Sequence, residues 1–239
     1  MITKAVFILL STLVALTSVA PAEDLPEGFT SISAGASFQG WKWHKDLEDR
    51  WEITDSGVVR LREDQPPRER GADYNLWSEK SYRDFTLMVD WRLTGKPVRM
   101  PMNAFTTDGL IKRDQNGEVV KHEIEHAGDS GIYLRGDPRF QVNIWSQPMG
   151  SGDINSLHKD ASLPVEVRRS LMPSLRADHP AGEWNRFVIT MRGDRVTVVL
   201  NGETVLDQAQ LPGVPEAGPI ALQNHGDPID FRNLWIREF

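Results

Sequence analysis

In the nine residues Phe85-Thr-Leu-Met-Val-Asp-Trp-Arg-Leu93, every second side chain from Phe85 to Leu93 is apolar, and those between are polar except for Met88. A period of two places the apolar set on one face of a β-strand and the polar set on the other. A second strand is expected from Trp184 to Met191, before the turn dipeptide Gly193-Asp194. The segment Arg195-Val-Thr-Val-Val-Leu200 then runs into Asn201-Gly202, the dipeptide most favoured in two-residue hairpins. These segments predict an antiparallel sheet.

The rest of the chain extends this all-β pattern. Two further strands are expected, from Pro219 to Gln223 and from Asp230 to Arg237. Only Pro164–Leu171 has the start and stop signals of a helix, and Lys96–Gly117 has no clear period. We therefore expect one domain, residues 23–239, built as an antiparallel β-sandwich with one short helix and a long loop insertion.

The N-terminus has the pattern of a secretory signal peptide. Lys4 precedes an apolar run, and the small residues Ala20-Pro21-Ala22 follow that run. We predict that residues 1–22 are a signal peptide cleaved after Ala22, which implies a secreted or periplasmic protein. The run is too short to favour a stable membrane span, although an uncleaved anchor is the alternative.

Composition excludes several classes of function. The chain has 239 residues, a formal net charge of −7 and no cysteine, which rules out disulfides. An acidic chain without a basic run lacks the clustered Lys and Arg that contact phosphates, so we expect no nucleic acid as a partner. The chain also has eight tryptophans, whose flat faces suit sugar rings as well as a core.

Two short motifs match known catalytic patterns but lack the expected context. His122-Glu-Ile-Glu-His126 fits the zinc-protease pattern, which requires a helix, yet the segment alternates like a strand. Gly128-Asp-Ser-Gly131 resembles a serine-protease nucleophile loop, but Ile132 replaces the next expected glycine. We interpret the first as a strand or extended loop and the second as a turn that leads into the strand Ile132–Arg135.

Three strands carry an unusual set of polar side chains opposite their core face. Their apolar residues are expected to point inward, which leaves amides, one guanidinium, one imidazole and two aromatic rings on the other face. These outward residues are Tyr133, Arg135, Gln141, Asn143, Trp145, Gln223 and His225. Amides and Arg give directional hydrogen bonds to hydroxyls, and an aromatic ring packs against the apolar face of a sugar. The pattern favours a carbohydrate cleft; the alternative is a second face covered by a loop, with no ligand.

Several short motifs, in this order and spacing, are together specific. They are Phe29, Gly40-Trp41, Trp51-Glu-Ile, Val58, Tyr82-Arg-Asp-Phe85, Asp129-Ser-Gly-Ile-Tyr-Leu-Arg135, Gly182-Glu-Trp-Asn185, Leu200-Asn-Gly202, Gly218-Pro-Ile-Ala-Leu-Gln223, His225-Gly226 and Phe231-Arg-Asn233. The chain thereby resembles the 3-keto-disaccharide hydrolase family, also described as 3-keto-glucoside lyase/hydratase domains. The resemblance covers nearly all of residues 23–239 and implies a concanavalin A-like jelly-roll sandwich.

One segment departs from the family pattern. The family usually has an aromatic-Glu-x-Gln-Ile strand followed by Asp, whereas this chain reads Phe140-Gln-Val-Asn-Ile144 and then Trp145-Ser146. Gln141 stands in place of the glutamate, and Ser146 in place of the aspartate. The long loop from Lys96 to His126 is also outside the common pattern. The chain is thus expected to belong to a divergent subfamily.

The resemblance implies cleavage or hydration of 3-keto-glycosides. A C3 ketone acidifies the C2 hydrogen, so a base can remove that proton and the enolate can expel the C1 substituent. We predict His225 as the base, unless it is a loop histidine with no role, because its unperturbed pKa lies near the working range. Arg135 and Asn143 would stabilise the oxyanion, with a buried ion pair as the alternative role of Arg135.

The remaining face would bind the oxidised glycoside. Gln141, Gln223 and Tyr133 are predicted to contact the substrate, and Trp145 to stack on the ring. Reserve carboxylates are Glu123, Glu125 and Asp129, whereas Arg232 is expected to form a structural pair. The sequence requires no cofactor and identifies no metal ligands, although a divalent metal is compatible with it. Two other functions remain open: a non-catalytic, lectin-like carbohydrate-binding module and a protein-interaction sandwich.

Overall fold

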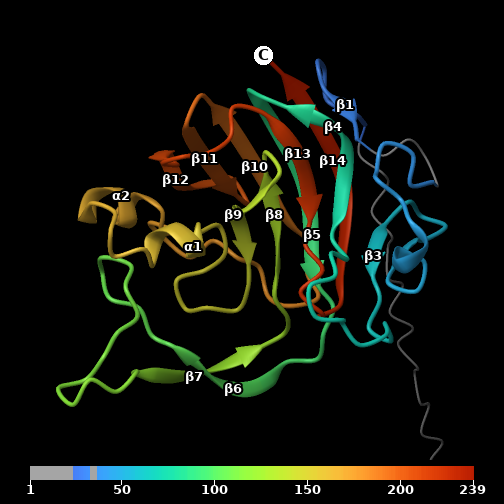
Figure 1. Ribbon diagram of the computed structural model, residues 1–239. Helices are drawn as coiled ribbons and strands as arrows, with labels where there is room; N and C mark the ends of the chain where they lie inside the picture. The colour runs from blue at the N-terminus through green and yellow to red at the C-terminus, as the bar shows by residue number, and fades with distance from the viewer. Residues whose placement is uncertain (1–23, 33–36) are drawn as a thin grey trace, which may run out of the picture.

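The computed structural model describes residues 24–32 and 37–239, so the predicted signal peptide, residues 1–22, lies outside the described residues. The described chain folds into two packed antiparallel sheets and a separate two-stranded hairpin (Figure 1). This jelly-roll sandwich confirms the predicted all-β class.

The large sheet has eight strands, and its main path runs in the order β12-β11-β10-β5-β14-β3-β2, with β1 paired to β14. Its central strand β5 covers Phe85–Leu93, the nine residues predicted from their alternation. The other bounds are β1 Thr30–Ser31, β2 Trp51–Ile53, β3 Val59–Leu61, β10 Asn185–Arg192, β11 Arg195–Leu200, β12 Glu203–Gln210 and β14 Ile229–Glu238. Asn201, at φ 52°, and Gly202, at φ 89°, form the predicted turn between β11 and β12.

The small sheet has four strands in the order β4-β13-β8-β9. These strands are β4 Leu76–Tyr82, β8 Ser130–Leu134, β9 Asp137–Ile144 and β13 Gly218–Leu222. Their predicted inward residues are fully or almost fully buried: Ile132, Leu134, Phe140, Val142, Ile144, Ile220 and Leu222. They pack against the apolar face of the large sheet and form one core with it. The opposite face of the small sheet is therefore free to carry polar side chains.

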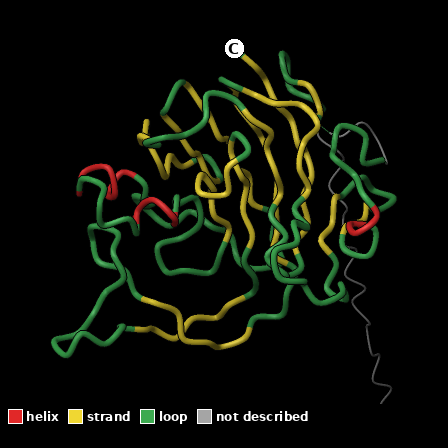
Figure 2. The backbone as a smooth tube through the Cα atoms, in the orientation of Figure 1, coloured by secondary structure: helices red, strands yellow, loops and turns green. Residues whose placement is uncertain are grey.

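The predicted loop insertion contains a β-hairpin. Strand β6 spans Val98–Asn103 and pairs with β7, Lys121–His126, beneath the ends of the two sheets (Figures 1 and 2). The chain leaves and re-enters the sandwich at nearly the same place, because Gly95 lies against the backbone of Ala127. A Cβ at Gly95 would lie 2.4 Å from the Ala127 carbonyl oxygen, so this approach requires glycine.

Two short α-helices lie beside the sandwich (Figure 2). Helix α2, Val165–Ser170, falls within the predicted helical segment. Helix α1, Asn155–His158, is only one turn long and has no apolar period from which it could be predicted. A single 3₁₀ turn, η1, covers Lys45–Leu47.

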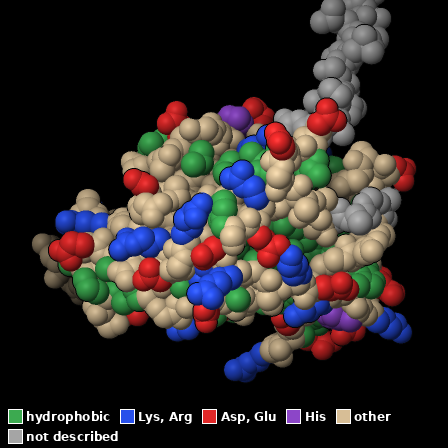
Figure 3. Space-filling model, turned by 90° about the horizontal axis from the view of Figure 1, so that it is seen from above, with side chains coloured by type: hydrophobic (Ala, Val, Ile, Leu, Met, Phe, Trp, Pro, Cys, Tyr) green, Lys and Arg blue, Asp and Glu red, His purple; other side chains and the backbone are tan. Residues whose placement is uncertain are grey.

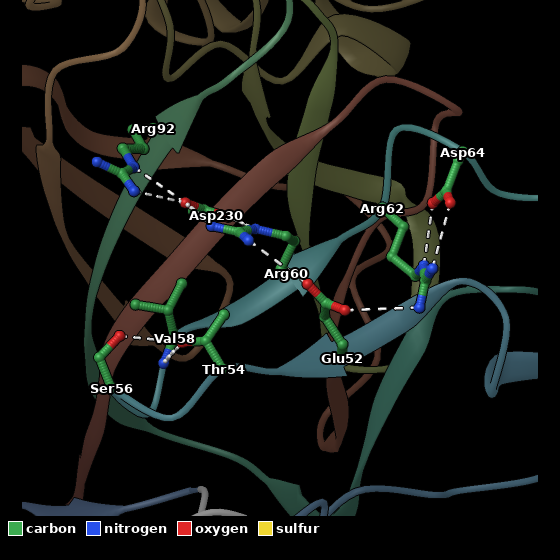
Figure 4. A network of polar contacts seen from close by, with 9 residues as sticks. All are labelled: Glu52, Thr54, Ser56, Val58, Arg60, Arg62, Asp64, Arg92 and Asp230. Carbon is green, nitrogen blue, oxygen red and sulfur yellow. Dashed lines mark hydrogen bonds and ion pairs between the residues drawn. The ribbon is translucent and has the colours of Figure 1, made fainter.

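The outer face of the large sheet carries paired charges. Asp230, fully buried, accepts hydrogen bonds from Arg60 at 2.7 and 3.1 Å and from Arg92 at 2.8 and 3.0 Å (Figure 4). Asp90 is held in the same way by Arg186, at 2.6 and 3.0 Å, and by Arg232 at 3.2 Å. The predicted structural role of Arg232 is thus confirmed, and both buried carboxylates are neutralised.

The molecular surface mixes the two signs of charge. On the face shown in Figure 3, acidic and basic side chains lie among one another, without a broad patch of one sign. Within residues 24–32 and 37–239, no helix is long and apolar enough to cross a membrane.

Candidate functional site

A chain of hydrogen bonds crosses the outer face of the small sheet. Gln141 donates from its amide to the Gln223 side chain at 2.6 Å, and Gln223 donates to the Tyr133 hydroxyl at 2.8 Å. The Tyr133 ring in turn stacks on Trp77, with 5.7 Å between ring centroids. Three predicted substrate-binding residues are therefore brought together: Tyr133 from β8, Gln141 from β9, and Gln223, which directly follows β13. Their ordered amide and hydroxyl groups are suited to recognising sugar hydroxyls.

Gly131 makes this arrangement possible. It lies in β8 opposite Asn143, and a Cβ there would lie 2.1 Å from the Gln141 side-chain nitrogen. Without that atom, the Gln141 amide lies across the strand and also donates to the Ser130 carbonyl at 3.2 Å. Residue 131 is thus glycine because a side chain passes over it, and no positive φ is involved.

A cluster of ionisable groups lies beside these amides. Asp227 lies between His126 and His225, with 3.7 Å from its Oδ2 to one ring nitrogen of each. The same oxygen accepts a hydrogen bond from the backbone N–H of Asp129 at 3.0 Å. The two histidines hold the pKa of Asp227 well below its usual value, so this carboxylate stays ionised. Asp227 therefore links the loop that carries His225 to the start of β8.

The environment shifts the pKa values of Asp129 and His225 upward. Burial raises the pKa of Asp129 to about 6, an effect that the charge of His225 partly opposes. The Asp227 carboxylate is the main cause of the raised pKa of His225, and the charge of Asp129 adds to it. The Asp129 side chain forms no hydrogen bond or ion pair within the described residues. Asp129 thus has a pKa of about 6, and its carboxylate oxygens accept no hydrogen bond from a described residue.

Asn143, predicted to stabilise the oxyanion, belongs to a buried network behind this cluster. Its amide donates to Asp153 at 3.2 Å, and the same carboxylate oxygen lies 3.1 Å from Nε2 of His158. Nδ1 of His158 donates to the Gly109 carbonyl at 2.7 Å, which ties the insertion to α1. The other oxygen of Asp153 is buried without a partner in the described structure, and burial raises the pKa of this group. Asn143 therefore positions Asp153.

Lys159 is a candidate functional residue that the sequence analysis missed. It directly follows α1, and its ammonium forms no hydrogen bond or ion pair with any described residue. Burial lowers the pKa of Lys159, and the charges of Asp153 and Asp129 partly oppose that shift. The side chain lines a cavity of about 160 Å³ together with Asn103, Gln147 and Asn155. It thus supplies an unpaired positive charge close to Asp129.

Arg135 does not join this group. Its guanidinium donates to the carbonyls of Arg83, Gly193 (2.7 Å) and Pro215 (3.0 Å), and to Asp84 at 3.0 Å. Only 2% of the residue is exposed, and its donors are directed at the turns at that end of the sandwich. Arg135 has φ 49°, so the strand alternation ends before it. The structure therefore corrects the expectation of an oxyanion role and supports the alternative, a buried ion pair.

Trp145 is placed between two cavities. One is the 160 Å³ cavity that Lys159 lines, and the other has a volume of about 390 Å³. Its indole N–H donates to the Gly150 carbonyl at 3.2 Å, and its ring lies 6.1 Å from that of Phe105. Because the residue is almost fully buried, it presents only a small part of its ring, and stacking on a sugar stays a prediction.

The first rejected motif lies on a strand, as expected, whereas the second does not form the expected turn, because its Ser130 and Gly131 already belong to β8. His122 and His126 lie on a strand, where four residues span about 13 Å. They also have different partners: His122 donates to Gln147 at 3.3 Å, whereas His126 faces Asp227. Ser130 is buried and donates to the Gln223 carbonyl, so its hydroxyl is already engaged. Within the described residues, no group of three or more His, Cys, Asp or Glu side chains could hold a metal ion.

A loop from the other end of the chain supports His225. Arg68 donates to the His225 carbonyl at 3.1 Å, and Gln65 donates to the carbonyl of Gly226 at 3.3 Å. Arg50 holds this loop from behind, through the carbonyls of Pro66 and Pro67. Although the side chain of His225 is 47% exposed, its backbone is thus fixed from two directions.

Comparisons with known proteins agree on the type of protein. Residues 28–237 match the family of 3-keto-alpha-glucoside-1,2-lyase-like domains. A 3-keto-disaccharide hydrolase of Bacteroides thetaiotaomicron is 22% identical over an alignment of 251 positions, which covers 88% of this chain and 78% of the relative.

Two solved structures share the fold. Both are of presumed glycosyl hydrolases from Parabacteroides distasonis. The first has a TM-score of 0.57 at 19% identity and covers 90% of this chain and 85% of its own. The second has a TM-score of 0.54 at 17% identity and covers 89% of this chain and 94% of its own.

Proposed function

The chain belongs to the family of 3-keto-alpha-glucoside-1,2-lyase-like domains, and from this premise we propose that it cleaves 3-keto-glycosides by proton abstraction at C2 and elimination at C1. The observation that carries the proposal is that Asp129 and His225 both lie beside one carboxylate, that of Asp227. Asp129 is an unpaired carboxylate with a pKa of about 6, and His225 has a raised pKa beside Asp227. General bases and acids work best with pKa values near the working pH.

In the first step, Asp129 removes the proton from C2 of the sugar. The C–H electron pair forms a double bond between C2 and C3, and the ketone oxygen becomes an enolate oxyanion. Lys159 is the unpaired cation near Asp129, and we assign to it the stabilisation of this negative charge. Arg135, whose donors are engaged elsewhere, has no part in this step.

In the second step, the enolate expels the substituent at C1. The electron pair returns through C2 to form a double bond between C1 and C2, and the C1–O bond breaks. His225 gives its proton to the departing oxygen, because Asp227 favours the protonated ring. Water then adds at C1 and a proton returns to C2, which completes hydrolysis. This proposal moves the base role from His225, predicted as the base from the sequence, to the reserve carboxylate Asp129, and makes His225 the acid.

The substrate-binding residues are those of the amide face. Gln141, Gln223 and Tyr133 offer ordered donors and acceptors for the sugar hydroxyls, and no step requires them to change charge. No step of the proposed mechanism requires a divalent metal. Export of the protein, with cleavage after Ala22, is part of the same proposal, and the mass of the N-terminal peptide of the mature protein would test it.

The experiment is incubation of the protein with a 3-keto-glycoside and, separately, with its unoxidised parent in deuterated water. Release of the C1 substituent and exchange of the C2 hydrogen, with the keto sugar alone, are the expected results. His225→Ala should retain C2 exchange while release of a poor leaving group falls, whereas Asp129→Asn should lose both. Equal cleavage of the unoxidised parent would contradict the proposal.

A second function, carbohydrate binding without turnover, is favoured by Gln141. This residue occupies the position where the family usually has a glutamate. Its amide nitrogen already donates hydrogen bonds to the Gln223 side-chain oxygen and to the Ser130 carbonyl. Saturable binding of the keto sugar with no exchange at C2 and no release would establish this function instead.

A further inference from the structure

A cavity of about 390 Å³ lies at one end of the sandwich, on the other side of the β7 backbone from the ionisable cluster. Glu125 and Ala127 line it, while His126 between them faces Asp227. The end of β5 contributes Trp91 and Leu93, and the loop before β10 contributes Arg176 and Pro180. The cavity is thus a separate site that shares one wall with the proposed catalytic group. Its volume is at the lower end of the range for small-molecule sites, enough for about one ring.

Trp91, which lines this cavity, has an unsatisfied donor. Only 2% of the residue is exposed, and its ring packs on Phe187 at 5.4 Å. Its indole N–H is buried and has no partner among the described residues. The other well-ordered indoles differ: Trp51 donates to the Tyr74 carbonyl at 2.9 Å, and Trp145 donates to Gly150. Since a buried donor without an acceptor is costly, an acceptor on a ligand would be favoured at this position.

The mouth of the cavity carries two further unpaired groups. Glu125 and Arg176 are exposed, and neither forms a hydrogen bond or ion pair with a described residue. The wall between them and Trp91 combines apolar groups of Leu93, Pro180 and Trp145 with the polar side chains of Ser146, Asp178, His179 and Asn185. A ligand that fits must therefore be ring-sized, with apolar C–H faces and several hydroxyls that both donate and accept.

We propose that this cavity binds an unoxidised hexopyranose. A ring or hydroxyl oxygen accepts from the Trp91 indole, further hydroxyls reach Glu125 and Arg176, and the C–H face of the sugar lies against the apolar wall. The choice of ligand class rests on the proposed function, since each cleaved 3-keto-disaccharide contains one unoxidised unit. The site itself needs no ketone and no turnover.

The test follows the indole N–H signals by ¹H–¹⁵N NMR while glucose, and separately maltose, is added to the protein. Trp91→Phe identifies the Trp91 signal. That signal should shift saturably with sugar, whereas the signals of Trp51 and Trp77, which have acceptors, should stay in place. Trp91→Phe should weaken glucose binding about tenfold by calorimetry, because one hydrogen bond to a buried donor is lost. Ala181→Phe, at the exposed rim, should block binding without altering the core.

The outcomes separate the two proposals. A shift of the Trp91 signal in a protein that leaves 3-keto-glycosides intact would retain the sugar site and reject the proposed activity. Cleavage with an unmoved Trp91 signal, or glucose binding that survives both substitutions, would reject the sugar site. A Trp91 signal that responds to glycine and not to glucose would assign the cavity to a zwitterion and overturn the proposal. Asp129→Asn, as a control, should bind glucose at this site like the wild type.

Discussion

The outer faces of the two sheets differ in whether their buried charged groups have ion-pair partners. On the large sheet, Asp230 (Figure 4) and Asp90 are each surrounded by guanidinium groups, and these interactions hold the sheet together. Beside the small sheet, Asp129 and Lys159 are withdrawn from water without forming an ion pair. The difference shows that burial of a charged residue does not by itself identify a functional site. A charge that burial leaves without a partner has a shifted pKa and free atoms, both of which chemistry requires.

The sharpest test of this contrast is Asp129→Asn. We expect kcat/KM for a 3-keto-glycoside to fall by about 10²–10⁴-fold, because the base is removed. The free energy of unfolding at pH 7 should be unchanged or higher, since a buried unpaired carboxylate is removed as well. Activity assays and urea unfolding of the same preparation check both results. A variant that is inactive because it is unfolded would place Asp129 with the structural carboxylates.

Lys159→Met tests the cationic half of the same cluster. Removal of one stabilising group for an oxyanion should lower kcat by about 10²–10³-fold. The folded state should keep its stability, because the ammonium has no ion-pair partner among the described residues. Arg135→Met is the matched control at the other end of the sheet: it should lower the unfolding free energy and spare kcat of the folded fraction. The reverse pattern would return the oxyanion role to Arg135.

Asp230→Ala should produce the opposite result to Asp129→Asn. It leaves Arg60 and Arg92 without their shared carboxylate, so we expect the free energy of unfolding to fall by about 3 kcal/mol. Asp64→Ala, which breaks the exposed pair with Arg62, should leave the free energy of unfolding nearly unchanged, because water and salt screen that pair. Urea unfolding measures both. Loss of activity in fully folded Asp230→Ala would show that the two faces are not independent.

Stability should depend on pH through Asp129. Its folded pKa, about 6, lies above its usual value of 3.8, so the folded state binds a proton more tightly than the unfolded state. This group therefore favours folding progressively as the pH falls from about 6 to 4, and opposes folding above pH 6. Asp227 acts oppositely: its pKa is lowered, so its stabilising effect is present above the unfolded pKa and is lost as the pH falls.

Urea unfolding of wild type and Asp129→Asn between pH 4 and 8 isolates the first effect. The stability advantage of the variant should be largest above pH 6 and should shrink toward pH 4. An advantage that does not vary with pH would mean that Asp129 has an ordinary pKa.

Gly131→Ala should give the smallest effect. The added methyl group would displace the Gln141 amide and break its bond to Gln223, but the end of this side chain can move. We expect KM for the keto sugar to rise several-fold, with kcat and the unfolding midpoint nearly unchanged. Gly57→Ala separates backbone strain from displacement of Gln141: its Cβ would meet nothing within 4 Å but its φ of 78° disfavours alanine, so it should lower the unfolding midpoint and leave KM unchanged. A large fall in kcat would move Gln141 from substrate binding into the chemistry.

Sequence predictions were accurate for features set by neighbouring residues and failed for features set by contacts between distant parts of the chain. Strands β5 and β11 were predicted to the residue, because a period of two is a local signal. The same rule placed Tyr133, Gln141 and Gln223 on one face. It failed at Arg135, where the strand has ended and the positive φ redirects the side chain.

Residues that depend on tertiary contacts could not be found in this way. Asp153 and Lys159 flank a one-turn helix, which is held by the contact of His158 with Gly109, 49 residues away. Strand β6 was also missed: Val98, Met100 and Met102 do alternate with other residues, but Pro101 argues against a strand and the segment pairs only with β7. His225 was found because it is a histidine near a strand end; its acidic neighbour Asp227 gave no separate signal.

The close contact of Gly95 with Ala127 has a consequence for how this fold can diversify. Because segment 96–126 begins and ends at one point, its length can change with little strain in either sheet, and the entropic cost of closing it grows only slowly with length. Relatives could therefore differ in the length and sequence of this segment while the two sheets stay the same. The wall that Glu125 and Ala127 supply to the larger cavity would then vary between relatives, whereas the amide face of β8, β9 and β13 would be inherited unchanged.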